Sequence, residues 1–199
     1  MKQDKVVWSL ALLLAMPGWV CAAEAQSPTA IQRMQLSAFG GVSGVYTGLS
    51  GGKNFSVTAG VDLALPPVVH LRPTVEVRGT YPTDHGLVDS QESALAGLRV
   101  DFPVGHRLHP YGDFLLGRGQ MNYGKFGYLY NNFQYILTTT VVYSPGAGID
   151  FDIGDHFGVK ADVQFQRWGS TPTSSGTIYS KVGTAGLVYR FDFNRYGGR

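Results

Sequence analysis

The sequence predicts an all-β protein, an eight-stranded antiparallel up-and-down transmembrane β-barrel, on three observations. Segments of about 10–12 residues alternate apolar and polar side chains, and a tilted strand that crosses a bilayer needs about 9–11 residues. The connections between them alternate long and short, as expected for external loops at one end and tight turns at the other. Charged residues make up only 15% of the chain, well below an ordinary soluble domain.

The beginning of the chain is predicted to be a signal peptide over residues 1–25. Two lysines precede an apolar run of about 11 residues, which is too short for a helix that spans a bilayer, and small residues follow. We expect cleavage after Ala25, with Ala23 as the alternative, and a barrel domain over residues 26–199. The only cysteine, Cys21, lies before that site, so the mature chain has no thiol for a disulfide, a nucleophile or a metal ligand.

Eight strands are then expected in order along the mature chain. The third, HLRPTVEVRGTY, shows the pattern best: Val75 and Val77 share one face, and Glu76 lies on the other. Residues 192–199 are expected to form a short periplasmic tail. The expected strands are 35–46, 54–65, 70–81, 92–102, 108–119, 138–153, 157–168 and 180–191.

The polar faces of these strands are predicted to point into the barrel. They mix both charge signs with glycines and small residues, which is typical of a narrow interior, and eight strands leave just enough room for side chains to fill it. The sequence does not assign Phe39 or Tyr111 to a face. We predict that paired interior charges plug the lumen, namely Arg72, Glu76, Arg78, Arg99, Asp101, Asp113, Asp150, Asp152, Lys160, Asp162 and Arg190.

Aromatic residues gather near the expected strand ends. Amphipathic rings favour the boundary between bilayer and water, so two girdles are predicted there, although aromatic residues are also common in strands generally. The residues expected in the girdles are Tyr46, Phe55, Tyr81, Phe102, Trp168, Tyr179, Tyr189 and Phe191.

Catalytic and metal-binding patterns are weak. His85 with Asp84 and Ser90 could be drawn as a triad, but loop residues this close in sequence lack a rigid scaffold, so no enzymatic activity and no cofactor are expected. Histidines three apart in GHRLH (105–109) point to opposite faces of a strand, which argues against a metal site. GLSGGK (48–53) lacks the Gly-Lys-Ser/Thr ending of a phosphate loop and is expected to be a hairpin loop.

The connection over residues 120–137 is rich in aromatic residues around a single charge, Lys125. Such a surface could contact a host, a sugar or another cell-envelope protein, because aromatic rings bury much area at small entropic cost. Alternatively, the flanking strands run on as a protruding hairpin whose aromatic residues pair across it. The candidate contact residues are Tyr123, Phe126, Tyr128, Tyr130, Phe133 and Tyr135.

Four stretches resemble the small outer-membrane β-barrel family, of the OmpA transmembrane domain and OmpX type: LSAFGGVSGVY, HPYGDFLLGRG, PGAGIDFDI and the closing GTAGLVYRF. The closing stretch is similar to the terminal-strand signal that the barrel-assembly machinery reads, except that DFNRYGGR follows Phe191 where family members commonly stop.

The resemblance implies export to the outer membrane and contact with outer-membrane lipid and lipopolysaccharide. It also implies a monomer with a structural or adhesive role, whose loops meet a host or cell-surface partner. The formal net charge of +2 favours no nucleic-acid partner. The alternatives are a small channel or carrier for hydrophobic or small polar solutes, a lipid A-modifying hydrolase, and a soluble barrel of lipocalin type.

Overall fold

The computed structural model describes residues 34–49, 52–68, 70–83, 90–102, 104, 106–124, 127–169 and 173–191. The predicted signal peptide, the predicted periplasmic tail and His85 lie outside these residues. In the part of the chain that is described, no helix is long and apolar enough to cross a membrane.

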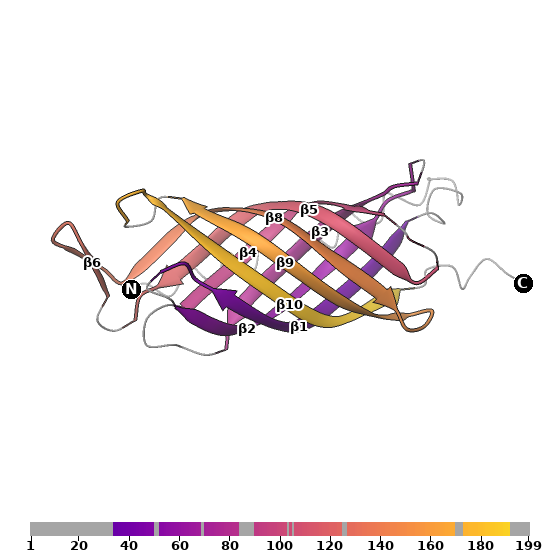
Figure 1. Cartoon of the computed structure of the whole chain (residues 1–199), viewed down its shortest axis with the longest axis horizontal. Helices are drawn as coiled ribbons and strands as arrows, with labels where there is room; N and C mark the ends of the chain where they lie inside the picture. Colours follow the sequence, from indigo (N-terminus) through magenta and orange to yellow (C-terminus); the bar gives the residue numbers. More distant parts are fainter. Residues whose placement is uncertain are drawn as a thin grey trace, which may run out of the picture. The chain divides into compact units, whose positions relative to one another are not determined.

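Eight strands form one closed antiparallel barrel, in the order β1-β10-β9-β8-β5-β4-β3-β2 (Figure 1). This confirms the predicted fold class. The remaining two strands, β6 and β7, pair only with each other. The strands are β1 (Gln35–Tyr46), β2 (Lys53–Ala64), β3 (Arg72–Pro82), β4 (Ser90–Asp101), β5 (Leu108–Asn122), β6 (Tyr128–Tyr130), β7 (Phe133–Tyr135), β8 (Leu137–Asp152), β9 (Phe157–Gly169) and β10 (Thr177–Phe191).

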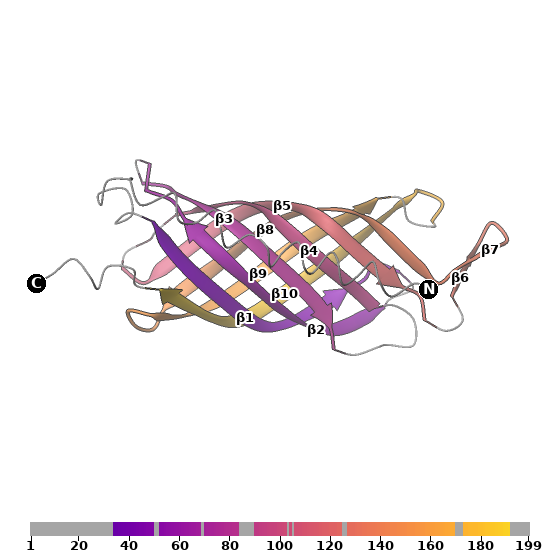
Figure 2. The ribbon, with the colours of Figure 1, turned by 180° about the vertical axis from the view of Figure 1, so that it is seen from behind.

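The barrel closes where the first strand meets the last. β1 lies between β2 and β10 (Figure 2). Its residues pair along nearly the whole strand, from Leu36 opposite Phe191 to Tyr46 opposite Lys181. Closure satisfies the backbone hydrogen bonds of both terminal strands, so the eight-stranded sheet has no open edge.

The two ends of the barrel differ less in their connections than the sequence suggests. We call the end that carries the β1–β2, β3–β4, β5–β8 and β9–β10 connections the loop end, and the opposite end the turn end. The β1–β2 connection (47–52) is no longer than the β2–β3 connection (65–71), because β2 and β3 stop early at the turn end. Only the β5–β8 connection (123–136) is much longer, and it holds β6 and β7.

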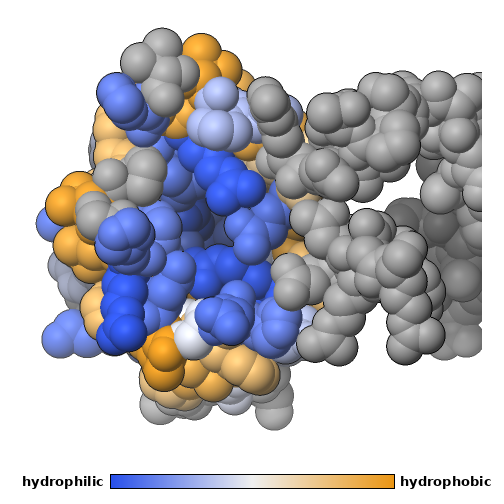
Figure 3. All heavy atoms as spheres, turned by 90° about the vertical axis from the view of Figure 1, so that its right-hand side faces the viewer, coloured by the Kyte–Doolittle hydropathy of each residue, from blue (hydrophilic) through white to orange (hydrophobic). Residues whose placement is uncertain are grey.

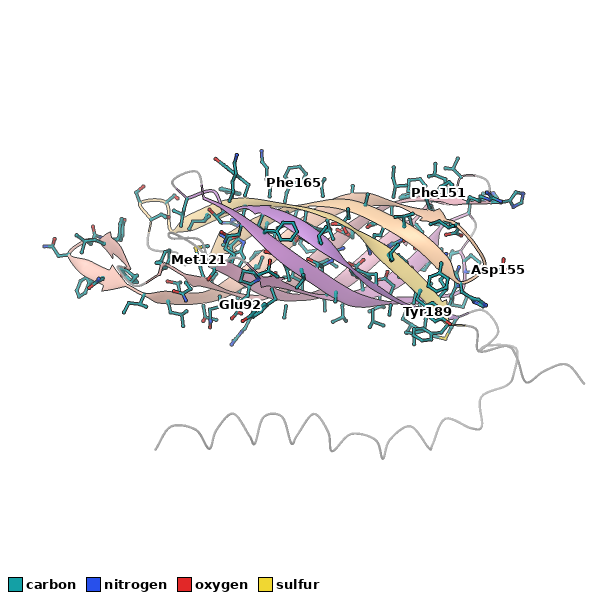
Figure 4. The ribbon with its side chains drawn as sticks, turned by 90° about the horizontal axis from the view of Figure 1, so that it is seen from below. Glu92, Met121, Phe151, Asp155, Phe165 and Tyr189 are labelled. Carbon is teal, nitrogen blue, oxygen red and sulfur yellow. The ribbon has the colours of Figure 1, made fainter. Side chains whose placement is uncertain are left out.

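Side chains alternate between the lumen and the outer surface along each barrel strand. On β3, Thr74, Glu76 and Arg78 are buried, whereas Val75 and Val77 are exposed. Outward residues elsewhere are also mainly apolar, and Figure 4 shows Phe151 and Phe165 projecting from the barrel. The barrel therefore encloses most of the charges of its strands and exposes mainly apolar side chains, which is the reverse of a water-soluble sheet.

The predicted girdle is wrong in one member. Trp168 is fully buried and points into the lumen. It lies an even number of residues from the other inward residues of β9, so it is on the same face. The other members are exposed, namely Tyr46, Phe55, Tyr81, Phe102, Tyr179, Tyr189 and Phe191. Tyr189 contacts the rings of Phe157 and Phe191 edge-on, with centroids 5.1 and 5.0 Å away.

Inward glycines make room for the large side chains of the lumen. A Cβ on Gly60 would lie 2.5 Å from the ring of Phe39, and one on Gly148 would lie 2.5 Å from that of Tyr111. A Cβ on Gly119 would lie 2.2 Å from the indole of Trp168. The high glycine content of the chain is thus partly a requirement of filling a narrow cylinder with bulky groups.

Candidate functional site

A network of buried ion pairs occupies the middle of the lumen. Arg78 on β3 donates from Nε to Glu76 at 2.5 Å, and its two terminal nitrogens donate to the two oxygens of Asp162 on β9 at 3.1 and 3.2 Å. These two parallel hydrogen bonds span the lumen, because β3 and β9 are not neighbours in the barrel. Arg78 therefore ties together strands that share no backbone hydrogen bonds.

Arg99 and Lys160 extend the same network. Arg99 on β4 donates from Nε to Asp101 at 2.7 Å and also pairs with Asp150 on β8. Lys160 on β9 lies 3.3 Å from Glu76 and 3.5 Å from Asp62, and Asp62 also accepts from Arg99 at 3.4 Å. Each buried cation thus contacts at least two carboxylates, which is the condition under which charges withstand removal from water.

Two aromatic rings complete this central layer. The guanidinium of Arg99 lies 3.5 Å from the ring centroid of Tyr111, and the ammonium of Lys160 lies 3.8 Å from that of Phe39. Both distances are within the range of cation–π attraction, which strengthens when the groups are removed from water. Phe39 and Tyr111, which the sequence left unassigned, are therefore inward residues that fill the space between the charges.

The turn end of the lumen is polar and less deeply buried. Asp152 pairs with Arg190 at 2.5 Å and lies 3.0 Å from Nε2 of His109, while Arg72 donates to Gln35 at 3.1 Å. Seen from this end, hydrophilic side chains surround a central recess, and hydrophobic ones lie toward the outer rim (Figure 3). Water can reach this layer, so its ion pairs contribute less to stability than the central network does.

The loop end of the lumen is filled by an apolar cluster instead. Trp168 lies within it, and its indole N–H donates to Ser180 at 2.9 Å and to Gln166 at 3.2 Å. Leu49 and Tyr135, from the connections, pack against it. The buried members are Leu95, Leu115, Met121, Tyr123, Val142, Trp168 and Ile178, and Figure 4 shows where Met121 lies. Below the rim, the lumen is therefore filled by this cluster together with buried polar side chains such as Ser56, Gln91 and Gln166.

The burial of Trp168 leads to a first prediction. Besides Trp168, the chain has tryptophan only at positions 8 and 19, within the predicted signal peptide. After cleavage of that peptide, Trp168 should be the single source of tryptophan fluorescence. We expect emission typical of an apolar site and little quenching by iodide, because the indole is fully buried. Urea-unfolded protein serves as the control and should be quenched freely. Equal quenching of the folded and unfolded forms would contradict the placement of Trp168.

The β5–β8 connection forms a small two-stranded ribbon beyond the rim. Tyr130 pairs with Phe133 across a turn in which Asn131 and Asn132 both have positive φ, a conformation that asparagine tolerates better than most residues. Leu129 and Phe133 are 71% and 69% exposed. The alternative of a protruding hairpin with aromatic residues paired across it agrees with this ribbon, in which Tyr128 lies opposite Tyr135 and Tyr130 opposite Phe133. The ribbon is, however, separate from β5 and β8, which end at Asn122 and begin at Leu137.

The predicted contact residues of this connection divide into two groups. Tyr123 is buried in the apolar cluster, and Tyr135 packs against that cluster, so both anchor the connection. Phe133 is exposed and Tyr130 is half-buried. Phe126 and the side chain of Tyr128 lie outside the described residues.

The predicted interior charges also fall into two groups. Arg72, Asp152 and Arg190 are half-buried at the turn end. Sequence reasoning missed one member of the network, Asp62, although the alternation that places Asn54, Ser56 and Thr58 on the polar face of β2 places it there too. The buried predicted charges are Glu76, Arg78, Arg99, Asp101, Asp113, Asp150, Lys160 and Asp162.

The described residues give no basis for a metal site. They contain no group of three or more His, Cys, Asp or Glu residues that could hold a metal ion. Ser90 is half-buried at the start of β4, while His85 and Asp84 lie outside the described residues.

Comparisons with solved structures identify the class of fold. Neisserial surface protein A superposes with a TM-score of 0.53 at 12% identity, covering 80% of this chain and 97% of that one. Ail, the attachment invasion locus protein of Yersinia pestis, superposes with a TM-score of 0.54 at 14% identity, covering 79% and 97%. No family model matches the chain. No curated protein matches it either.

The chain thus has the fold of an eight-stranded outer-membrane β-barrel. More narrowly, the closed eight-stranded barrel is the fold that the resemblance to small outer-membrane barrels implies.

Proposed function

We propose that this protein is a non-enzymatic outer-membrane barrel with a structural or adhesive role and a lumen that conducts no solute. The observation that carries the proposal is the double closure of the lumen: buried ion pairs fill the middle, and the apolar cluster fills the loop end. A polar solute would have to break the buried ion pairs in the middle of the lumen and lose its hydration water in the apolar cluster at the loop end. An export signal over residues 1–25, insertion by the barrel-assembly machinery and a monomeric state belong to the same proposal.

The adhesive part of the proposal is supported by the ribbon of β6 and β7. It stands beyond the rim with Leu129 and Phe133 largely exposed, at 71% and 69%, and Ile136, which follows β7, is 59% exposed. Exposed apolar side chains on a rigid support suit contact with a host or cell-surface partner, because they bury area without much loss of conformational freedom. Ail, one of the structural neighbours, is named as an attachment invasion locus protein.

Planar-bilayer recording tests the closed lumen. We expect the purified, refolded protein to give no steady single-channel openings over a wide range of voltage, because buried ion pairs occupy the middle of the lumen. Refolding is checked separately by electrophoresis with and without boiling, in which a closed barrel shifts its mobility on heating. Steady unitary currents from a heat-modifiable sample would contradict the sealed lumen and favour a small channel.

A further inference from the structure

The buried side chains of the lumen carry more negative than positive charge. Among the described residues, three buried cations face six buried carboxylates. Adding the half-buried layer at the turn end, with two arginines and one aspartate, still leaves an excess of two carboxylates. A carboxylate that is removed from water without a cation is costly, and such a group usually becomes neutral by taking up a proton. The buried cations are Arg78, Arg99 and Lys160, and the buried carboxylates are Asp62, Glu76, Asp101, Asp113, Asp150 and Asp162.

The hydrogen bonds of this layer show the same shortage. Oδ1 of Asp62 and Oδ1 of Asp150 are buried, and neither accepts a hydrogen bond from the described residues. The layer thus has more acceptor atoms than donors as well as more negative than positive charge. A proton bound to a carboxyl group supplies a donor and a positive charge together.

Asp113 is the buried carboxylate with the weakest cationic partner. Each of the other five has a guanidinium nitrogen within 3.4 Å. The cation nearest to Asp113 among the described residues is Arg78, whose Nη2 lies 3.9 Å away. Nε and both terminal nitrogens of Arg78 already donate to Glu76 and Asp162, so they contribute little to Asp113.

The other strands around Asp113 do not make up for this. Both guanidinium groups near it donate to other carboxylates, and the ammonium of Lys160 contacts Glu76 and Asp62. An ionised Asp113 would therefore add a like charge beside Glu76 and Asp162. The charged or titratable groups around Asp113 are Arg78 and Glu76 on β3, Arg99 on β4, Tyr111 on its own β5, Asp150 on β8, and Lys160 and Asp162 on β9.

A glycine lets an amide reach Asp113 from two strands away. Asp113 on β5, Gly146 on β8 and Gln164 on β9 lie side by side in the sheet. A Cβ on Gly146 would lie 2.2 Å from Nε2 of Gln164, so the glycine provides the space that the amide occupies. Nε2 donates to the two oxygens of Asp113 at 3.0 and 2.8 Å, and Oε1 accepts from Oγ of Ser144 at 2.8 Å.

An amide is a suitable partner for a carboxyl group that binds a proton, because it has a donor and an acceptor at the same reach. Facing an ionised Asp113, Gln164 presents Nε2. After rotation of the amide by half a turn, Oε1 accepts the proton of Asp113 and Nε2 donates to Oγ of Ser144. A guanidinium or an ammonium in the same place could only donate, and would therefore hold the carboxyl group ionised.

From these observations we propose that Asp113 and Gln164 form a proton-binding site, in which Asp113 carries a proton at neutral pH and donates it to Gln164. The proposal goes beyond the proposed function and depends only on the closed barrel. It makes the packing of the lumen sensitive to pH. Loss of the proton at alkaline pH adds a charge to a layer that already has too few cations.

Infrared spectroscopy of the refolded protein tests the site, in micelles of an alkyl glucoside, which has no carbonyl group of its own. A protonated carboxyl group has a C=O stretching band above the amide I band that moves to lower frequency in D2O, whereas an ionised carboxylate has none there. We expect this band at neutral pH and expect Asp113→Asn to lose it or reduce it by one carboxyl group. Asp152→Asn is the control and should leave the band unchanged, because Asp152 is paired with Arg190 at the turn end. Absence of the band, or its full intensity in a heat-modifiable Asp113→Asn protein, would disprove the site.

The variant Gln164→Met tests the partner separately, including the case in which Asp113→Asn does not fold. Methionine has a similar volume but cannot accept the proton of Asp113 in a strong hydrogen bond. The band should therefore remain and move to higher frequency. An unshifted band in a heat-modifiable Gln164→Met protein would contradict the hydrogen bond between the two side chains.

The pH dependence of unfolding provides a second readout of the same proton. In the unfolded chain Asp113 is ionised at neutral pH, because a solvated aspartate has a pKa of about 4. Unfolding of the unchanged protein should therefore release one proton that Asp113→Asn does not release. Between about pH 5 and pH 7, the unfolding constant of the unchanged protein should rise about tenfold per pH unit relative to that of the variant. Parallel pH dependences of the two proteins in urea titrations would count against a proton on Asp113.

Discussion

Replacement of Arg99 by methionine is expected to lower the free energy of unfolding by about 3–5 kcal/mol, the cost typical of removing one partner from a buried ion pair. Methionine keeps much of the volume but leaves Asp101 and Asp150 without their cation in a closed lumen. It also removes the guanidinium that lies over Tyr111. Urea titration of the protein in phosphatidylcholine vesicles, followed by tryptophan fluorescence and by electrophoretic mobility, measures the loss.

Arg107 provides the matched control for this change. It is an exposed arginine of the β4–β5 turn, so Arg107→Met should change stability by no more than about 0.5 kcal/mol. A loss below about 1 kcal/mol for Arg99→Met would show that the central network contributes little, and that the barrel is held by its backbone pairing alone.

The second large effect is expected on the outer surface. Val163 is the central residue of β9 and is 46% exposed, so Val163→Arg places a charge at the middle of the hydrocarbon layer. The expected loss is about 2–4 kcal/mol, the cost of arginine at the bilayer midplane of a β-barrel. The same urea titration in vesicles measures it.

Tyr179 shows whether this loss depends on depth. It is 68% exposed near the loop-end start of β10, where Tyr179→Arg should cost only about 0–1 kcal/mol. A soluble barrel would tolerate arginine at both positions alike, because both side chains would face water. Equal small effects of the two substitutions would therefore overturn the assignment of the outer face to lipid.

Much of the fold could be predicted from the sequence because successive side chains of a barrel strand face the outer surface and the lumen in turn, so their polarity alternates. The expected third strand, 70–81, begins two residues before β3 and ends one residue before β3 does, and the faces of Val75 and Glu76 are as the alternation indicates. The alternation of loop lengths was a weaker guide, since it depends on where each strand stops. Those stopping points are set by contacts at the barrel ends that no single segment contains.

The content of the lumen was harder to predict than its orientation. Alternation places Leu95 and Trp168 inside, but the expectation of a polar interior hid the apolar cluster to which they belong. Phe39 and Tyr111 resisted assignment because their rings suit lipid as well as a lumen, and the cations beneath them come from distant strands.

The pairing of the charges lay outside the reach of sequence reasoning altogether. Arg78 and Asp162 are 84 residues apart and meet only because the closed cylinder brings β3 opposite β9. Asp62, by contrast, could have been included, since the period of β2 places it on the same face as Thr58.

The junction of β1 with β10 also constrains how the molecule comes into being. Leu36 and Phe191 lie opposite each other in the sheet, yet one belongs to the first strand of the barrel along the chain and the other to the last. Any nascent form that lacks the last strand exposes a free ribbon edge, which invites aggregation until the missing partner arrives. Safe maturation therefore depends on keeping the incomplete sheet away from other chains for as long as the final strand is absent.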